Sequence, residues 1–295
     1  MRILIFGKAG QVARSLHDLE WPSSWHLTFL GRDDCDLLRP GVAAEAIGTL
    51  KPDLVINAAA YTAVDKAEND KVAAYALNAD APAEMAAATD ALGVPLLHIS
   101  TDYVFEGGGE RPYLETDTCA PLSMYGKSKL DGEIRVREAN TRHLILRTSW
   151  VFSSYGANFV RTMLRLGGER DELSVVGDQW GGPTAAGDIA HALQRIGLAM
   201  AKGRTAYGTY HLAGDPFTSW YGFAQAIFER AQAKGAKAPK SLRRITTAEY
   251  PTPAVRPANS RLDCAAIGRD WNIEQPSWEI ALDRCLDQLL RPANV

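Results

Sequence analysis

A glycine-rich turn near the N-terminus restricts the folds that this chain can adopt. The apolar run Ile3–Phe6 leads directly into Gly7 and Gly10, and a helical pattern follows. One glycine permits a tight turn, and another lets the backbone approach a pyrophosphate at the N-terminus of the helix. The segment is typical of a dinucleotide-binding unit, although any strand, turn and helix can use the same glycines for structural reasons alone.

Short apolar runs alternate with helix-length segments through the first half of the chain. The expected strands are Ile3–Phe6, His26–Leu30, Leu54–Asn57, Val94–Ile99 and His143–Leu146, and the helices between them include Val42–Leu50 and Ala83–Leu92. Runs that are apolar on both faces are typical of a parallel sheet covered by helices. An all-helical protein fits poorly, because the strand candidates are short and several contain β-branched residues. We therefore expect an α/β fold with a Rossmann-type doubly wound parallel sheet.

The pattern loosens in the second half, where tryptophan, proline and glycine become frequent. Helices are expected at Asn158–Leu166, Asp188–Ala201, Ser219–Ala233 and Trp278–Leu290. We expect residues 1–150 to form a dinucleotide-binding domain, completed by part of 184–213. Residues 151–295 are expected to form mainly a smaller C-terminal α/β lobe that binds the substrate.

Composition excludes several classes of protein. With 46% hydrophobic and 23% charged residues, the chain is globular and not disordered. Its formal net charge of -3 leaves no basic surplus to neutralise a phosphate backbone, so no nucleic-acid partner is expected. No stretch approaches the ~18 apolar residues of a membrane span, and the N-terminal apolar run is too short for a signal sequence. We expect a cytoplasmic protein with no membrane partner.

The cysteines lack the spacing of a metal site. Cys35, Cys119, Cys264 and Cys285 form no CxxC pair and have no histidine at zinc-finger spacing. We therefore expect reduced thiols and no bound metal.

The residues after the second expected strand bear on which nicotinamide nucleotide would bind. An acid at the tip of that strand would bind the ribose 2′-hydroxyl, but His26–Leu30 is followed by Gly31 and Arg32. Arg32 could face a 2′-phosphate, which would favour NADPH or the use of both NADPH and NADH. It could equally be a solvated loop charge, and the sequence leaves both interpretations open.

A tyrosine and a lysine one helical turn apart are the candidate catalytic pair. Tyr125 and Lys129 are four residues apart, which puts them on one face of a helix. A phenol has an ordinary pKa of ~10, and a nearby cation favours the phenolate and lowers that pKa. Tyr125 could then protonate a carbonyl oxygen while a nicotinamide delivers hydride to the carbon. The same spacing also occurs by chance on many solvated helix faces.

Hydroxyl groups follow the fourth expected strand. Ser100 and Thr101 come at the carboxyl end of that strand, where ligands bind in doubly wound folds. Either hydroxyl could hydrogen-bond a substrate carbonyl. Together with the glycine turn, these residues favour a catalytic role for Tyr125 and Lys129 over a solvated helix face.

Patterned segments occur along essentially the whole chain. They are GKAGQV at 7–12, NAAAYTAVDKAE at 57–68, STDYVF at 100–105, YGKSK at 125–129, RTSWVF at 147–152, GPT at 182–184 and RPANSRL at 256–262. Together they resemble the dTDP-4-dehydrorhamnose reductase family of the extended short-chain dehydrogenases. The segments at 65–68 and 256–262 are far more specific to that family than the general dehydrogenase motifs.

The resemblance implies NADPH- or NADH-dependent reduction of the C4 ketone of dTDP-4-dehydro-L-rhamnose to dTDP-L-rhamnose. It implies that Thr101 orients the carbonyl, that Tyr125 donates the proton, and that Lys129 tunes Tyr125 and holds the nicotinamide ribose. The residues expected at the cofactor are Gly7, Gly10, Gln11, Val12, Arg32, Asp36, Leu37, Ala59, Ala60, Tyr61, Thr62, Tyr125 and Lys129, and those at the sugar nucleotide are Thr101, Asp102 and Trp150. Trp150 could instead be an aromatic residue that closes the core.

One position departs from part of the family. Some members form a dimer that is bridged by magnesium through acidic residues, one of which lies in the helix after the glycine turn. Here the matching position carries Ser15, whose hydroxyl is a weak ligand for a hard dication. We expect a monomer or a weak homodimer without magnesium at its interface.

Two other interpretations keep the nucleotide-binding fold. One is another extended nucleotide-sugar reductase or epimerase, and an epimerase would retain its nicotinamide whereas a reductase exchanges it. The other is a non-catalytic regulatory subunit, in which loss of Tyr125 or Lys129 would be expected. Both residues are present.

Overall fold

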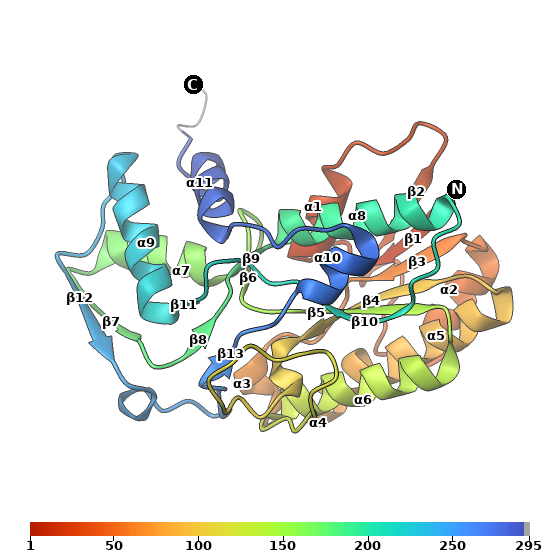
Figure 1. Cartoon of the computed structure of the whole chain (residues 1–295), viewed down its shortest axis with the longest axis horizontal. Coiled ribbons are helices and arrows are strands. Elements are labelled where there is room, and N and C mark those ends of the chain that lie inside the picture. The colour runs from red at the N-terminus through yellow and green to blue at the C-terminus, as the bar shows by residue number, and fades with distance from the viewer. Residues whose placement is uncertain (292–295) are drawn as a thin grey trace.

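A six-stranded parallel sheet is the central element of the computed structural model, which describes residues 1–291 (Figure 1). Its strands are β1 (Arg2–Phe6), β2 (His26–Leu30), β3 (Leu54–Asn57), β4 (Leu96–Thr101), β5 (His143–Thr148) and β10 (Gly208–His211). They lie in the order β2-β1-β3-β4-β5-β10, and every neighbouring pair is parallel. The predicted Rossmann-type sheet is confirmed.

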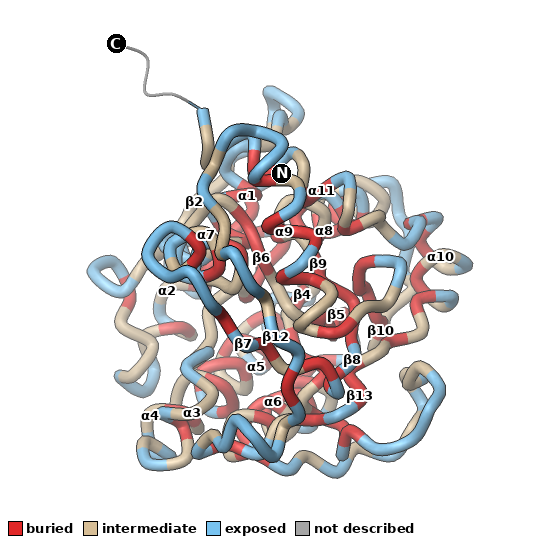
Figure 2. Tube along the Cα trace, turned by 90° about the vertical axis from the view of Figure 1, so that its left-hand side faces the viewer, coloured by how far each residue is buried: buried red, intermediate tan, exposed pale blue. Residues whose placement is uncertain are grey.

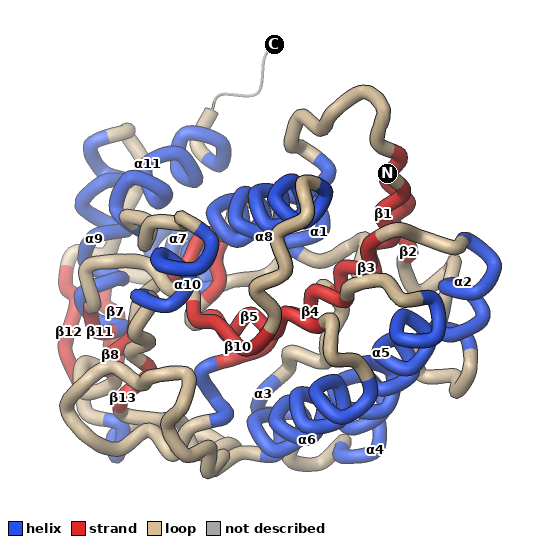
Figure 3. Tube along the Cα trace, turned by 45° about the vertical axis from the view of Figure 1, so that its right-hand side comes forward, coloured by secondary structure: helices blue, strands red, loops and turns tan. Residues whose placement is uncertain are grey.

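Helices cover both faces of the sheet (Figure 3). One face carries α1 (Gln11–His17), α8 (Ala186–Ala201) and α10 (Ala265–Trp271), and the other carries α2 (Val42–Leu50), α5 (Ala81–Leu92) and α6 (Met124–Ala139). Alternate residues of β1 divide between the two layers: Ile3 and Ile5 join the core under α8, whereas Leu4 and Phe6 join the core under α5. The inner strands such as β4 and β5 are accordingly buried (Figure 2), whereas the edge strand β2 is only partly buried.

Three short helical elements follow β3 and lead into α5, which in turn precedes β4. They are α3 (Val64–Ala67), α4 (Lys71–Tyr75) and a π-helical turn at Ala76–Asp80. A 3₁₀ turn at Asp102–Val104 follows β4 directly. This turn lies at the carboxyl edge of the sheet, where α6 begins nearby.

The second lobe has its own core at one end of the molecule (Figure 1). Its helices are α7 (Phe159–Glu169), α9 (Trp220–Ala233) and α11 (Trp278–Leu289), and Thr247–Glu249 forms a 3₁₀ turn. Its short strands pair as β7 (Glu172–Val176) with β12 (Ser241–Ile245), β8 (Trp180–Gly181) with β11 (Thr218–Ser219) and β13 (Asn259–Ser260), and β6 (Val151–Phe152) with β9 (Thr184–Ala185). The chain returns to the large sheet through α8 and β10. Residues 292–295, the end of the predicted second lobe, lie outside the described residues.

Several element ends differ from the sequence prediction for local reasons. Strand β4 begins at Leu96 instead of Val94, because the backbone N–H of Val94 donates to the Thr89 carbonyl as part of the C-terminal cap of α5, which ends at Leu92. Strand β5 continues to Thr148, through polar residues that the apolar pattern did not mark as strand. Helices α7 and α9 begin one residue later than predicted.

Side chains at the two shifted helix starts explain the difference. Asn158 accepts a hydrogen bond from the backbone of Arg161, and Ser219 accepts one from the backbone of Gly222. Each is therefore the N-cap of its helix and not its first residue.

Three further observations concern the described residues. No helix within residues 1–291 has the length and apolar character needed to cross a membrane. All four cysteines are free thiols. No group of three or more histidine, cysteine, aspartate and glutamate side chains in the same residues is arranged to hold a metal ion.

Candidate active site

A cleft of about 810 Å³ opens at the carboxyl ends of the parallel strands. Its wall is formed by the residues that follow β1, β2, β3, β4 and β5, and by Trp220 and Arg256 of the second lobe. This volume lies within the range of ~300–1,000 Å³ that is usual for ligand sites. Every residue that the sequence analysis assigned to the cofactor or the substrate lines this cleft, except Tyr61.

The glycine turn connects β1 to α1, and it lies beside the end of the neighbouring strand β3. Gly7 has φ of 99°, and a Cβ at this position would lie 2.7 Å from the backbone of Ala58. Only glycine fits this close approach. Gln11 and Val12, in the first turn of α1, also line the cleft. N–H groups in the first turn of a helix have no partner within the helix, so this turn can bind an anion.

The loop after β2 carries mixed charges. The Arg32 guanidinium is largely exposed and lies 3.7 Å from the carboxylate of Asp36. Asp34 accepts a hydrogen bond from the backbone of Gly31 and lies 3.4 Å from the ammonium of Lys8. Arg32 thus lines the cleft while its side chain remains solvated.

Tyr61 points away from the cleft. Its hydroxyl donates to Asp70 at 2.9 Å, and its backbone N–H donates to Asn78 at 2.8 Å. Its neighbours Ala60 and Thr62 line the cleft. The structure therefore does not bring the Tyr61 side chain together with the other predicted cofactor residues.

Tyr125 lies in the first turn of α6, whose start is fixed from two sides. Ser123 caps the helix by accepting from the backbone of Gly126, and Glu68 accepts from the backbone of Met124 at 2.8 Å. The Tyr125 ring packs edge-on against Tyr103, with ring centroids 5.5 Å apart. Burial raises the pKa of Tyr125 well above its ordinary value, and the hydroxyl of Thr101 partly opposes this shift.

Lys129 lies one turn after Tyr125 on α6, is buried, and contacts β4. Its Nζ donates to the carbonyl of Ile99 at 2.7 Å and lies 3.2 Å from Nε2 of His98. Burial lowers the pKa of Lys129 to about 8. The ammonium group was predicted to lower the pKa of Tyr125, but burial dominates at both residues and moves the phenol pKa in the opposite direction.

Thr101 and Asp102 face the same cleft at the end of β4. The Thr101 hydroxyl donates to Asp102 Oδ1 at 3.0 Å and accepts from the backbone of Tyr103 at 3.2 Å. Asp102 is 3% exposed, and its Oδ2 has no hydrogen-bond partner among the described residues. Burial raises the pKa of Asp102 to about 6. An unpaired buried carboxylate oxygen in a cleft is suited to accept a hydrogen bond from a ligand hydroxyl.

Trp150 belongs to the cleft wall. It stacks on Trp220, with ring centroids 3.6 Å apart and planes at 12°. Its backbone has φ of 51°, a left-handed conformation that is rare for a tryptophan. A Cβ at Gly181 would lie 2.7 Å from the Trp150 ring, so that glycine makes room for it. Trp150 thus lines the cleft and also packs on Trp220 beside the second core.

Arg256 of the second lobe lines the cleft, although it was not among the predicted site residues. Its guanidinium lies 2.6 Å from the Asp65 carboxylate and 3.3 Å from the Tyr103 hydroxyl. Asp65 and Arg256 lie in the two most family-specific segments of the sequence. The presence of both residues in family-specific segments was the only sequence signal that could have pointed to this contact.

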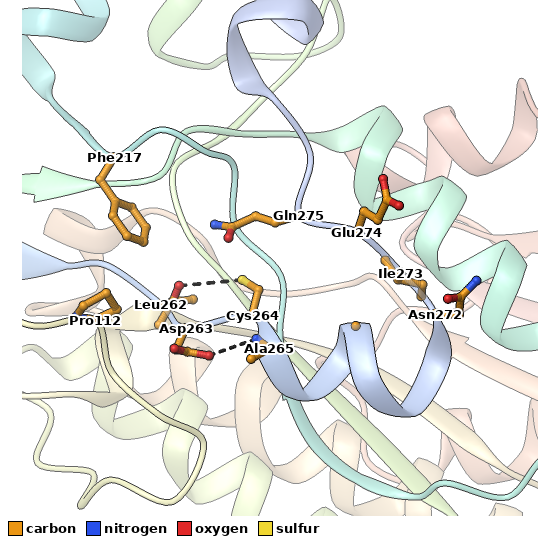
Figure 4. A pocket seen from close by; sticks show the side chains of 11 residues that line it. Pro112, Phe217, Leu262, Asp263, Cys264, Ala265, Asn272, Ile273, Glu274 and Gln275 are labelled. Atoms are coloured by element: carbon orange, nitrogen blue, oxygen red, sulfur yellow. Dashed lines mark hydrogen bonds between the residues drawn. The ribbon is translucent and has the colours of Figure 1, made fainter.

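A second cavity of about 410 Å³ lies beside α10 (Figure 4). Cys264 at its wall donates to the carbonyl of Leu262, and Asp263 accepts from the backbone of Ala265. Its described lining residues include Asp263 and Glu274 but no basic side chain. This cavity is therefore poorly suited to a nucleotide diphosphate.

Comparison with known proteins supports one family. A family model described as the RmlD substrate binding domain matches residues 1–291. The chain is 46% identical to a dTDP-4-dehydrorhamnose reductase of Sinorhizobium fredii, over 98% of each chain. It is 42% identical to a protein of the same name from Escherichia coli K12, again over 98% of each chain.

The chain belongs to the dTDP-4-dehydrorhamnose reductase family.

Solved structures agree with membership of the dTDP-4-dehydrorhamnose reductase family. A reductase of this name from Clostridium acetobutylicum aligns with a TM-score of 0.90 at 37% identity, over 98% of this chain and 99% of that one. A reductase from Bacillus anthracis, solved in complex with NADP, aligns with a TM-score of 0.89 at 34% identity, over 97% and 99%. The family resemblance inferred from the sequence motifs is confirmed.

Proposed function

We propose that the protein reduces the C4 ketone of dTDP-4-dehydro-L-rhamnose to dTDP-L-rhamnose, with NADPH or NADH as the hydride donor. The observation that carries this proposal is the meeting of Thr101, Tyr125 and Lys129 at one cleft beside the glycine turn. Full-length similarity to reductases of this name supports the same reaction.

The cleft suits a dinucleotide on structural grounds. Gly7 allows the turn to pack against the backbone of Ala58, and this turn leads into the first turn of α1, whose free N–H groups can bind a pyrophosphate. The small residues Ala59 and Ala60 continue this wall. Arg32 and Asp36 lie at the far end, where the adenosine ribose would bind. When bound, the reduced nicotinamide supplies the hydride.

The protein supplies the proton and the orientation of the ketone. Tyr125 donates its phenolic proton to the carbonyl oxygen, and its raised pKa keeps the phenol protonated before the reaction. Lys129 holds the nicotinamide ribose and stabilises the phenolate that results. The Thr101 hydroxyl orients the carbonyl.

The sugar nucleotide contacts both lobes in this proposal. Asp102 accepts a hydrogen bond from a sugar hydroxyl through its unpaired Oδ2, and Trp150 packs against the sugar. Residues 1–150, with part of 184–213, bind the cofactor, and most of the remaining chain binds the substrate. Ser15 on α1 offers only a hydroxyl at the position where an acid would be needed for a magnesium bridge.

A direct assay tests the proposal. The purified protein is mixed with dTDP-4-dehydro-L-rhamnose and either NADPH or NADH, and oxidation of the cofactor is followed together with the product. We expect dTDP-L-rhamnose and stoichiometric oxidised cofactor. Conversion only of a UDP- or GDP-sugar, or tightly retained cofactor with no net oxidation, would overturn the proposal in favour of another reductase or an epimerase. Cofactor binding without any turnover would indicate a regulatory subunit.

A further inference from the structure

A buried chain of hydrogen bonds joins Lys129 to β3 through His98. Lys129 Nζ lies 3.2 Å from His98 Nε2, and on the other side of the ring His98 Nδ1 lies 3.0 Å from Asn57 Nδ2. Asn57, His98 and Lys129 are each exposed by 1% or less. Because water does not reach these groups, their donors and acceptors must match one another.

The backbone of Ala59 determines the orientation of the Asn57 amide. Its N–H can only donate, and it lies 3.0 Å from Asn57 Oδ1. The NH₂ group of Asn57 therefore faces His98 Nδ1 and requires this nitrogen to accept. Burial holds the pKa of His98 well below its ordinary value, so the ring is neutral. A neutral ring that accepts at Nδ1 carries its proton on Nε2.

The His98 tautomer then restricts the charge of Lys129. With its proton on Nε2, His98 donates toward Lys129 Nζ. An ammonium group has three hydrogens and no lone pair, so only the neutral amine can accept this bond. The neutral amine still has hydrogens for the carbonyl of Ile99 at 2.7 Å. Each contact from Ala59 to Ile99 joins one donor to one acceptor only when Lys129 is uncharged.

We propose that, in mildly alkaline solution, His98 holds Lys129 as a neutral amine in the cofactor-free protein, and that Lys129 takes up a proton when the dinucleotide binds. The proton comes from the buffer and forms a new N–H bond on Nζ, whose lone pair then no longer accepts from His98. His98 is a positioning residue, because it acts through Lys129. The inference rests on the proposed function, since the anionic cofactor provides the negative charge that favours the ammonium group.

The other charged groups near Lys129 do not remove this effect. Glu133 lies one turn further along α6 and favours the ammonium form, but its carboxylate is already paired with Arg147 of β5 at 2.7 Å. Tyr125 lies one turn earlier and is kept neutral by burial. Asp102 is at the end of β4, and β3 contributes the uncharged Asn57.

Calorimetry of cofactor binding tests the inference without turnover. NADPH is titrated into the full-length protein near pH 9, in buffers of different ionisation enthalpy, and the dependence of the heat on the buffer gives the number of protons taken up. With a Lys129 pKa of about 8, we expect uptake that approaches one proton per site. Below about pH 7 the uptake should fall towards zero, because Lys129 is then already protonated.

Substitutions identify the groups that cause the uptake. Asn57→Asp gives both Ala59 and His98 an acceptor, so the His98 proton moves from Nε2 to Nδ1, and Nε2 then accepts from the ammonium group. We expect this variant to bind NADPH with little uptake near pH 9. Lys129→Met should also remove the uptake, and Lys127→Met, which changes an exposed lysine of the same helix, should retain it.

The possible failures are distinguishable. If NADPH binds to the unaltered protein without proton uptake, or with uptake that does not change with pH, the neutral-amine proposal is wrong and the proposed function stands. If Asn57→Asp binds NADPH with the uptake of the unaltered protein, the tautomer argument is wrong. If the unaltered protein binds neither NADPH nor NADH, the proposed function itself fails. Because the pH series uses the unaltered protein, it decides the matter even if a variant does not fold.

Discussion

Arg256 lies 2.6 Å from Asp65, although the two residues are 191 positions apart in the sequence. Asp65 lies in α3, which follows β3 of the large sheet, and Arg256 comes from the loop before β13 in the second lobe. The backbone of Ala254 also donates to Asp65 at 3.2 Å. One carboxylate therefore attaches a loop of the second lobe to the first lobe at the rim of the cleft.

Loss of this carboxylate should affect the substrate more than the fold. Both side chains are partly exposed, so Asp65→Asn should lower the free energy of unfolding by about 1 kcal/mol or less. Because Arg256 lines the cleft, its displacement should raise KM for the sugar nucleotide while changing the affinity for NADPH little. Steady-state kinetics and urea unfolding measure the two effects. An unchanged KM would show that the Arg256 position does not matter for the substrate.

Tyr125→Phe tests the proton donor. The substitution removes only the hydroxyl, so turnover should fall by ~100-fold or more while the affinity for NADPH remains nearly unchanged. Turnover and cofactor binding are measured separately, the latter by fluorescence titration. Tyr103→Phe, at the neighbouring ring, is the matched control and should retain most of the turnover. Normal turnover in Tyr125→Phe would remove Tyr125 from its proposed role.

The buried carboxyl of Asp102 should make stability depend on pH. Its folded pKa of about 6 lies above the ordinary 3.8, so ionisation is unfavourable in the folded state. This destabilisation is absent at low pH, develops as the pH rises from about 4 to 6, and is complete above that. Relative to the unaltered protein, Asp102→Asn should gain up to about 3 kcal/mol between pH 4 and pH 7. Urea unfolding at both pH values checks this, and a constant difference would contradict it.

The buried Glu133–Arg147 pair should contribute far more to stability than an exposed pair. These side chains are 0% and 3% exposed and lie 2.7 Å apart. Glu133→Gln leaves a buried guanidinium without its counter-charge, so the unfolding free energy should fall by about 3–5 kcal/mol. Glu169→Gln breaks the exposed pair with Arg165 and should change it by less than about 0.5 kcal/mol. Chemical denaturation of both variants decides the point, and equal effects would contradict the argument.

Much of the sheet could be predicted from local patterns. The apolar run of β1 and the glycine turn after it are adjacent in sequence, and their physical roles depend on neighbouring residues only. The start of α7 was predicted to within one residue for the same reason. The end of β5 was missed because Arg147 and Thr148 are polar, and their burial depends on Glu133 and on other distant partners.

The composition and motifs of the chain were enough by themselves to specify a doubly wound α/β fold, a nucleotide-binding edge and the family. Hydrophobic periodicity and glycine geometry act over a few residues, so they can be followed along the sequence. Only the tertiary structure revealed the contact between Lys129 and His98 and the contact between Asp65 and Arg256. Desolvation and hydrogen-bond matching depend on which distant groups the fold places within about 3 Å of one another, and sequence spacing does not contain that information.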